Sequence, residues 1–403
     1  MFRSPRARLL VLIVWAGAGL STSAASPESL SITVEWLSDP SRAGRASGGA
    51  GARATADYLL EEFRRIGLEA GFQAIGPGRQ NVVGRIGDQP AHIIVGAHYD
   101  GQGRGRPSAS DNAAGVAVLL ELAQELAGTP LPVSVVFIAF DDEENGLNGS
   151  RYYVQNPVYP LEDLATAVIL DTMGRSFMDL ERWTLIVLGT EFSPELAAVV
   201  GRLDDPEIEL IGTDLIGARS DFAPFAARRI PYLFFTNATH RDYHGTGDTP
   251  DRIRYDRLDR DAGTILQVIL DVARLGSVPT FRTQPSYPQH EAGLLSGYID
   301  LIEAERPDLA ESYRLLFGDL RVRLEGNPSR EALHLAATVL LSAATPRLSA
   351  FPLAYAIGPF YEAEGAPEIA RAAYREALSI GPDPATESYL GVRLEALEVS
   401  LPD

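Results

Sequence analysis

The chain of 403 residues contains no cysteine and, although 35 residues are basic, no lysine, so every permanently positive side chain is an arginine. Without cysteine, the chain cannot form disulfides, thiolate zinc sites or a cysteine nucleophile. Acidic residues outnumber basic ones by 54 to 35, which gives a formal net charge of −19. Because phosphate backbones and anionic lipids repel a chain with this charge, we expect no nucleic acid partner.

Long apolar runs are also missing, except near the N-terminus. Residues 9–19 are apolar, follow Arg3, Arg6 and Arg8, and precede small residues up to Ala25. This order predicts a secretory signal peptide over residues 1–25. The run is shorter than the roughly 20 residues that span a bilayer, so an uncleaved membrane anchor is the less favoured alternative. We therefore predict an exported protein, periplasmic or secreted, with no stable membrane insertion after cleavage.

Residues 26–278 alternate short apolar runs with amphipathic segments, as expected for a sheet covered by helices. The apolar runs lack polar–apolar alternation, so both faces of the sheet should be covered. The sequence predicts an α/β fold, a three-layer α/β/α sandwich with a mostly parallel mixed sheet. Predicted strands span residues 92–98, 133–140, 165–170, 183–188 and 230–236, and predicted helices span residues 54–66 and 115–126.

A proline- and threonine-rich linker over residues 279–291 precedes a smaller all-helical domain over residues 292–403. Small and aromatic residues between Ala354 and Pro382 resemble a tetratricopeptide-like hairpin. An unrelated helical domain fits equally well, because such arrays usually need at least three repeats. These helices would shield an active site or recruit a protein partner. Helices are predicted at residues 294–303, 310–320, 330–341 and 366–378.

Polar side chains follow the predicted strands, where α/β sheets carry their chemistry. Singly, each has an ordinary explanation, since a lone histidine usually forms a hydrogen bond and an aspartate before a helix usually caps it. At one sheet edge, however, several carboxylates would repel one another unless a cation lay between them. Imidazole and carboxylate ligands without thiolates suit Zn²⁺, or Mn²⁺ or Co²⁺. The residues are His98, Asp100, Asp111, Glu143, Glu144, Asp171 and His244.

Several short motifs support this prediction. They are GAHYD at residues 96–100, SDNAAGV at residues 110–116 and YHGTGDTP at residues 243–250. Together with residues 137–150 and 220–225, they resemble the secreted cocatalytic dizinc aminopeptidases. These leucyl-aminopeptidase-like zinc exopeptidases of metallopeptidase clan MH share their fold with glutamate carboxypeptidase II and glutaminyl cyclase. The resemblance runs from about Arg45 to Leu266 and excludes the C-terminal helices.

The resemblance implies two Zn²⁺ ions that share Asp111. His98 and Asp171 would complete one metal site, and Glu144 and His244 would complete the other. The charges are consistent with this, because three carboxylates and two neutral imidazoles against two divalent cations leave a charge of +1. A bridging water can cancel that charge by losing a proton near neutral pH, which yields a hydroxide.

The same resemblance assigns roles to three further residues. Glu143 would be the general base that takes the proton of this water and passes it to the leaving amine. Asp100 would hold the far nitrogen of His98. Tyr243 would donate to the developing oxyanion, with simple packing beside a ligand as the alternative.

Two features leave alternatives open. His240 is a second candidate ligand, but His244 fits the family segment better because Tyr243 precedes it and GTGDTP follows it. Asp141 and Asp142 stand where relatives commonly carry small or neutral residues. They would either make the rim of the site acidic, which would favour basic substrates, or lie exposed on a loop.

The sequence thus predicts a metal-dependent exopeptidase, an aminopeptidase that hydrolyses the first peptide bond of peptides or proteins. A glutaminyl-cyclase-like aminoacyltransferase with a single zinc is the nearest alternative, and metal counting separates the two. A dipeptidase or carboxypeptidase on the same fold is a further alternative, because the motifs define the metals and not the pocket. A non-catalytic receptor ectodomain would be expected to have lost some of the five ligands.

Overall fold

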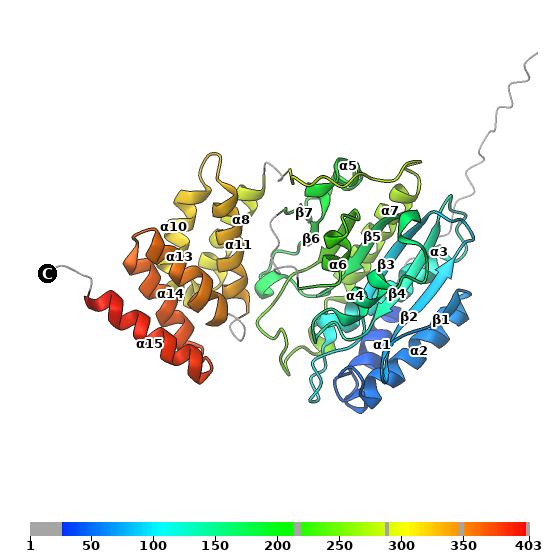
Figure 1. Ribbon diagram of the computed structural model, residues 1–403, viewed down its shortest axis with the longest axis horizontal. Helices are drawn as coiled ribbons and strands as arrows, with labels where there is room; N and C mark the ends of the chain where they lie inside the picture. Colours follow the sequence, from blue (N-terminus) through cyan, green and yellow to red (C-terminus); the bar gives the residue numbers. More distant parts are fainter. Residues whose placement is uncertain (1–25, 213–218, 287–289, 346–349, 400–403) are drawn as a thin grey trace, which may run out of the picture.

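The computed structural model describes residues 26–212, 219–286, 290–345 and 350–399 (Figure 1). The signal peptide predicted for residues 1–25 lies outside the described residues. An eight-stranded sheet has the strand order β1-β2-β4-β3-β5-β8-β6-β7. The strands are β1 (Glu69–Gly76), β2 (Arg79–Ile86), β3 (His92–His98), β4 (Ser134–Phe140), β5 (Leu164–Leu170), β6 (Leu185–Leu188), β7 (Ile208–Leu210) and β8 (Tyr232–Thr236).

The four central strands of the sheet, β4, β3, β5 and β8, run parallel to one another. Antiparallel pairs flank them, with β1 and β2 on one side and β6 on the other, and β7 runs parallel to β6. The predicted mostly parallel mixed sheet and its five predicted strands are confirmed. β1, β2 and β7 were not predicted, because β1 is exposed or half-buried throughout and β7 has only three residues.

Successive side chains of the central strands point to opposite faces of the sheet. Ile93 and Val95 of β3 pack in the core beneath α1, α2, α3, α5 and α7, whereas Ile94 packs in the core beneath α4 and α6. Helices therefore cover both faces, and the predicted sandwich is confirmed. These helices are α1 (Pro27–Ser38), α2 (Ala50–Ile66), α3 (Ala114–Leu126), α4 (Asn148–Gln155), α5 (Pro194–Val200), α6 (Phe222–Ala227) and α7 (Tyr255–Ala273).

The described residues from 290 onward are helical and lie beyond the β6–β7 end of the sheet (Figure 1). The predicted helix over residues 310–320 is instead two helices that meet at Tyr313. In the segment predicted to be tetratricopeptide-like, Gly358 packs against Tyr374 so closely that an added Cβ would lie 2.1 Å from the tyrosine ring. The resemblance to a tetratricopeptide hairpin stays a prediction. The helices are α8 (Glu291–Glu305), α9 (Pro307–Ser312), α10 (Arg314–Leu324), α11 (Arg330–Ala344), α13 (Gly358–Ala363), α14 (Pro367–Ser379) and α15 (Pro384–Val399).

None of the helices in the described ranges has the length and apolar character needed to cross a bilayer.

A buried polar contact joins the C-terminal helices to the sheet. The Tyr298 hydroxyl of α8 donates to Glu209 Oε2 of β7 at 2.6 Å, and Arg182 pairs with the other oxygen of that carboxylate. The Tyr298 ring packs edge-on against Phe177, with 5.0 Å between the ring centroids. Since Tyr298 and Glu209 are 1% and 2% exposed, the contact is shielded from water and ties α8 to β7.

We predict that Tyr298→Phe lowers the free energy of unfolding by about 1–3 kcal/mol, because a buried carboxylate loses one of its two donors. Chemical denaturation measures the difference. Tyr355→Phe is the matched control, since that ring is 39% exposed, and it should change stability by less than about 0.5 kcal/mol. Equal stability of the two variants would contradict the prediction.

Candidate active site

The carboxyl ends of the parallel strands meet at one edge of the sheet and carry the predicted site residues. His98 is the last residue of β3, and Asp171 directly follows β5. The backbone N–H of Tyr99 donates to the Phe140 carbonyl at 2.9 Å, which aligns the ends of β3 and β4. Because β3 lies between β4 and β5, the side chains that follow these three strands are adjacent.

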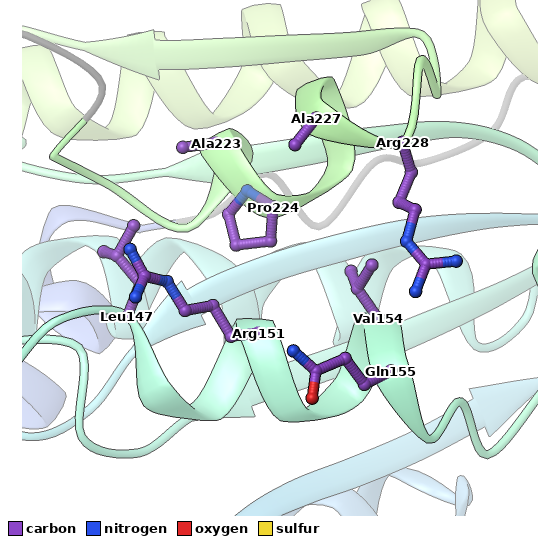
Figure 2. Close-up of a pocket in the computed structure, with 8 residues that line it drawn as sticks. All are labelled: Leu147, Arg151, Val154, Gln155, Ala223, Pro224, Ala227 and Arg228. Carbon is purple, nitrogen blue, oxygen red and sulfur yellow. The ribbon is translucent and has the colours of Figure 1, made fainter.

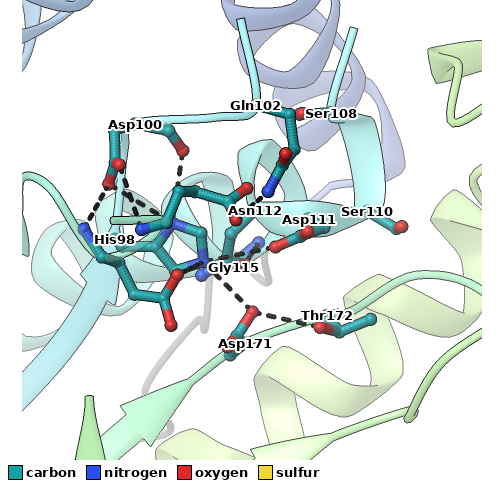
Figure 3. A network of polar contacts seen from close by, with 12 residues as sticks. His98, Asp100, Gln102, Ser108, Ser110, Asp111, Asn112, Gly115, Asp171 and Thr172 are labelled. Carbon is teal, nitrogen blue, oxygen red and sulfur yellow. Dashed lines mark hydrogen bonds and ion pairs between the residues drawn. The ribbon is translucent and has the colours of Figure 1, made fainter. Parts of the chain in front are cut away.

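Asp111 lies between the two predicted histidine ligands. Its Oδ1 is 3.3 Å from His98 Nε2, and its Oδ2 is 3.1 Å from His244 Nε2 (Figure 3 shows the His98 side). Asp171 Oδ1 is 3.3 Å from His98 Nε2, and Glu144 Oε2 is 3.3 Å from His244 Nε2. The structure thus brings the five predicted ligands together in two groups that share Asp111.

The donor set of these two groups fits metal ions. His98 Nδ1 lies 3.2 Å from the Asp100 carbonyl, so this nitrogen carries the ring proton and Nε2 faces carboxylate oxygens. The unprotonated Nε2, Asp111 Oδ1 and Asp171 Oδ1 are all hydrogen-bond acceptors. Because they converge, a positive charge must lie among them. Glu144 Oε1 is also buried without a hydrogen-bond partner. Imidazole nitrogens and carboxylate oxygens in this arrangement are the ligands that zinc takes in catalytic sites.

The pKa values also indicate that the clustered carboxylates lack a compensating positive charge. Burial and the charge of Asp111 together raise the pKa of Glu144 to about 7. Burial also raises the pKa of Glu143 well above its ordinary value. Burial alone would lower the pKa of His98, but the carboxylates of Glu143 and Asp171 outweigh this effect and raise it well above 6.5. These carboxylates therefore favour a cation beside them, whether proton or metal.

Asp100 has a wider positioning role than predicted. Its carboxylate Oδ1 is 3.6 Å from His98 Nδ1, farther than its own carbonyl oxygen. The two carboxylate oxygens accept the backbone N–H groups of Glu143 at 3.1 Å and Glu144 at 3.3 Å. Asp100 therefore orients a histidine through its backbone and the two glutamates through its side chain.

Glu143 and Tyr243 adjoin the two groups, and Glu143 lies close enough to His98 and Asp171 to be a further candidate ligand. Glu143 Oε2 is 4.0 Å from His98 Nε2, and the residue is 7% exposed. The Tyr243 ring stacks on His244, with 3.9 Å between the centroids, so Tyr243 packs beside a candidate ligand. Burial raises the pKa of Tyr243 well above 10, which keeps its hydroxyl proton available for donation.

His240 lies apart from the two groups and supports the loop that carries Asp111. Its Nε2 is 2.6 Å from Ser110 Oγ, and this hydroxyl donates to Asp248 Oδ1 at 2.8 Å. The Asp248 carboxylate also accepts the backbone N–H of Asp111 at 3.2 Å. The sequence identified Asp248 only as part of a motif and missed this contact.

Both interpretations of Asp141 and Asp142 are wrong, because the two side chains are buried. Asp141 Oδ2 accepts the Gln80 backbone N–H at 3.0 Å. Asp142 pairs with Arg79 at 2.9 Å and accepts the side-chain amide of Asn145 at 2.7 Å. The carboxylates face β2 and the start of α4 and form neither an acidic rim nor an exposed loop.

Arg45 holds the loop between His98 and Asp111, although the sequence gave it no role. It is 1% exposed and donates to the carbonyl oxygens of Tyr99 at 2.9 Å and Ser108 at 2.8 Å. Two further donations reach the carbonyls of Leu37 and Pro107. Burial lowers the pKa of Arg45 to about 10, and the nearby acids oppose that effect. Contacts to carbonyls leave no signature in the sequence pattern.

A groove of about 560 Å³ runs beside the site between α4 and α6 (Figure 2). At one end is Leu147, whose backbone N–H donates to the Glu143 carbonyl at 2.8 Å. Arg228 lies at the opposite end from Leu147 (Figure 2). The groove therefore starts one turn from the candidate base. It is lined by Leu147, Arg151, Val154, Gln155, Ala223, Pro224, Ala227 and Arg228.

An α/β/α sandwich with two histidine–carboxylate groups at the carboxyl ends of its parallel strands is an arrangement suited to a metal-dependent enzyme. Residues 81–269 match the sequence model of the family described as Peptidase family M28. This region, which is 189 of the 403 residues, is therefore similar to that peptidase family.

Named relatives and solved structures are similar to the same region. Aminopeptidase YwaD of Bacillus subtilis is 27% identical over 215 residues, which are 50% of this chain and 46% of YwaD. The chain therefore spans about half the length of that relative. BSAP, a zinc aminopeptidase from Bacillus subtilis, superposes with a TM-score of 0.54 at 16% identity, covering 64% of this chain and 98% of BSAP. Porphyromonas gingivalis glutaminyl cyclase superposes with a TM-score of 0.51 at 19% identity, covering 60% and 97%.

We predict that Arg45→Ala destabilises the protein by about 3 kcal/mol or more, because four buried carbonyl groups lose a charged donor. Thermal unfolding measures the effect. Arg53→Ala is the matched control from the same segment, since Arg53 is exposed and donates only to the Gly48 carbonyl. The prediction is wrong if the two variants melt at the same temperature.

Proposed function

We propose that the protein is an aminopeptidase that removes the N-terminal residue of peptides, with two zinc ions held by His98, Asp111, Glu144, Asp171 and His244. The position of Asp111, within 3.3 Å of both histidines, supports this proposal most strongly. Zinc in such a site supplies a Lewis acid that polarises a carbonyl and acidifies water. The similarity to named aminopeptidases supports cleavage at the N-terminus of the peptide.

The side chains around the proposed metals would divide the remaining work. Glu143 adjoins a ligand and would accept a proton from water and deliver it to the leaving amine. Asp100 would hold Glu143 in place through the backbone bond described above. Tyr243 would donate its hydroxyl proton to the negative charge that develops on the peptide carbonyl oxygen.

A single-zinc aminoacyltransferase is the second candidate, because a glutaminyl cyclase has the same fold. The close approach of both Asp111 and Asp171 to His98 favours the peptidase, since these three residues would complete a second metal site. The predicted signal peptide supports a location outside the cytoplasm, either periplasmic or secreted.

The adjacent glutamates provide a sharp test of the proposed base. We predict that Glu143→Gln keeps the bound zinc but lowers kcat for leucyl-anilide at least 100-fold, the scale of general-base catalysis. Glu144→Gln should instead release zinc, because it removes a ligand. Metal analysis and steady-state kinetics on both variants separate these effects. Undiminished turnover in Glu143→Gln would remove this residue from the mechanism.

Metal removal tests the number of zinc ions. A chelator should abolish hydrolysis, and added Zn²⁺ should restore it with two ions per chain. His98→Ala should retain one ion, because the group formed by Asp111, Glu144 and His244 is intact. One ion per chain in the unmodified protein, with His98 dispensable for activity, would favour the aminoacyltransferase.

A further inference from the structure

A group of arginines lines a cavity beside the candidate active site. This cavity measures about 400 Å³ and is lined by Arg175, Asp179, Arg241, Arg252 and Arg306. Asp179 and Asp242 pair with Arg175 and Arg252, and Asp308 pairs with Arg306 at 3.7 Å, so four guanidiniums have three paired carboxylates. This excess of one guanidinium, in a chain of net charge −19, favours a negatively charged ligand.

The Asp242 carboxylate is shared by two arginines, and arginine donors are left unused. Asp242 Oδ2 is 3.1 Å from Arg175 and 2.9 Å from Arg252. Arg175 is 3% exposed, yet its Nη1 has no hydrogen-bond partner. Arg241 is exposed and makes no ion pair with the part of the chain that the structure describes. Buried donors are normally satisfied, so this arrangement has capacity for an acceptor from outside.

A cation does not fit this cavity. Asp179, His240 and Asp242 lie close enough together to resemble a third metal site. However, Arg175 pairs with both carboxylates, Arg252 also pairs with Asp242, and His240 is already bonded to Ser110. A divalent ion here would also be repelled by the surrounding guanidiniums. The charge and the free donors therefore select an anion.

The cavity is close to the proposed metals. Asp242, which anchors two of the arginines, lies two residues before His244 on one loop, and Arg175 lies four residues after Asp171. An extended peptide covers about 10 Å in three residues, which sets the range of substrate positions to be tested. Arg306 follows α8, and its Nη1 donates to the Met178 carbonyl at 3.3 Å. The C-terminal helices thus supply one of the four arginines.

We propose that this cavity binds an oxyanion, and that the carboxylate of an acidic peptide substrate supplies it. The guanidinium fork matches a carboxylate or phosphate with two parallel hydrogen bonds. This inference rests on the proposed peptidase function for its source of carboxylate. A free anion such as inorganic phosphate has the same chemistry and is the other source to be tested.

The test compares peptides that differ by one charge. Tetrapeptides with N-terminal leucine carry Glu or Gln at the second, third or fourth position, and kcat/KM is measured for each. The zinc-loaded wild-type chain should prefer Glu by about tenfold at one of these positions, and salt should weaken the preference. Arg241→Ala and Arg306→Ala should reduce it to less than about twofold. Arg375→Ala is the control, because Arg375 is exposed on α14 and should leave the preference unchanged.

A second measurement does not depend on catalysis. Inorganic phosphate should raise the melting temperature of the wild-type chain more than that of either cavity variant. Phosphate stabilisation without a Glu preference would identify a free anion as the ligand. Absence of both effects would overturn the inference. If the zinc-loaded wild-type chain does not hydrolyse leucyl-anilide, the proposed peptidase function is wrong. The phosphate measurement alone then shows whether the cavity binds an oxyanion.

Discussion

The structure depends on the crowding of acceptors around two imidazole rings. Asp111 approaches both rings, and Asp171 and Glu144 each approach one of them, at distances of 3.1 to 3.3 Å. Such a group is stable only with positive charge inside it. The ends of β3 and β5 and the loop before α3 bring His98, Asp171 and Asp111 into position, so a cation bound there would stabilise the folded chain.

The scaffold around this site is built from backbone contacts. Arg45 binds the carbonyls on either side of the loop between β3 and Asp111, and Asp248 binds the backbone N–H of Asp111 itself. Asp100 binds the N–H groups that present the two glutamates. Charged side chains that are fully hydrogen-bonded in this way hold irregular loops rigid, which a metal site with fixed distances requires.

The sheet was predictable because unbroken apolar runs mark the buried central strands. His98 and Asp171 stood at predicted strand ends and Asp111 before a predicted helix, whereas the assignment of five metal ligands came from the resemblance of the motifs to the dizinc aminopeptidases and stays a prediction. The partly exposed β1 and the three-residue β7 lack that pattern. Arg45, Gln102 and Asp248 were missed for a different reason, since their partners lie in distant segments; Gln102, for example, donates to Glu144. Asp141 and Asp142 were misjudged because nothing local shows that Gln80 and Arg79 reach them.

The most direct measurement is zinc-edge anomalous diffraction from crystals of the zinc-loaded protein. The proposed site predicts two anomalous peaks, one on each side of Asp111, with ligand distances of about 2.0–2.2 Å to the histidine nitrogens and carboxylate oxygens. Zinc bound only elsewhere, for example at Asp179, His240 and Asp242, would contradict it. A single peak beside Glu144 and His244 would be consistent with the fold and with one metal site but would contradict the proposed pair of zinc ions.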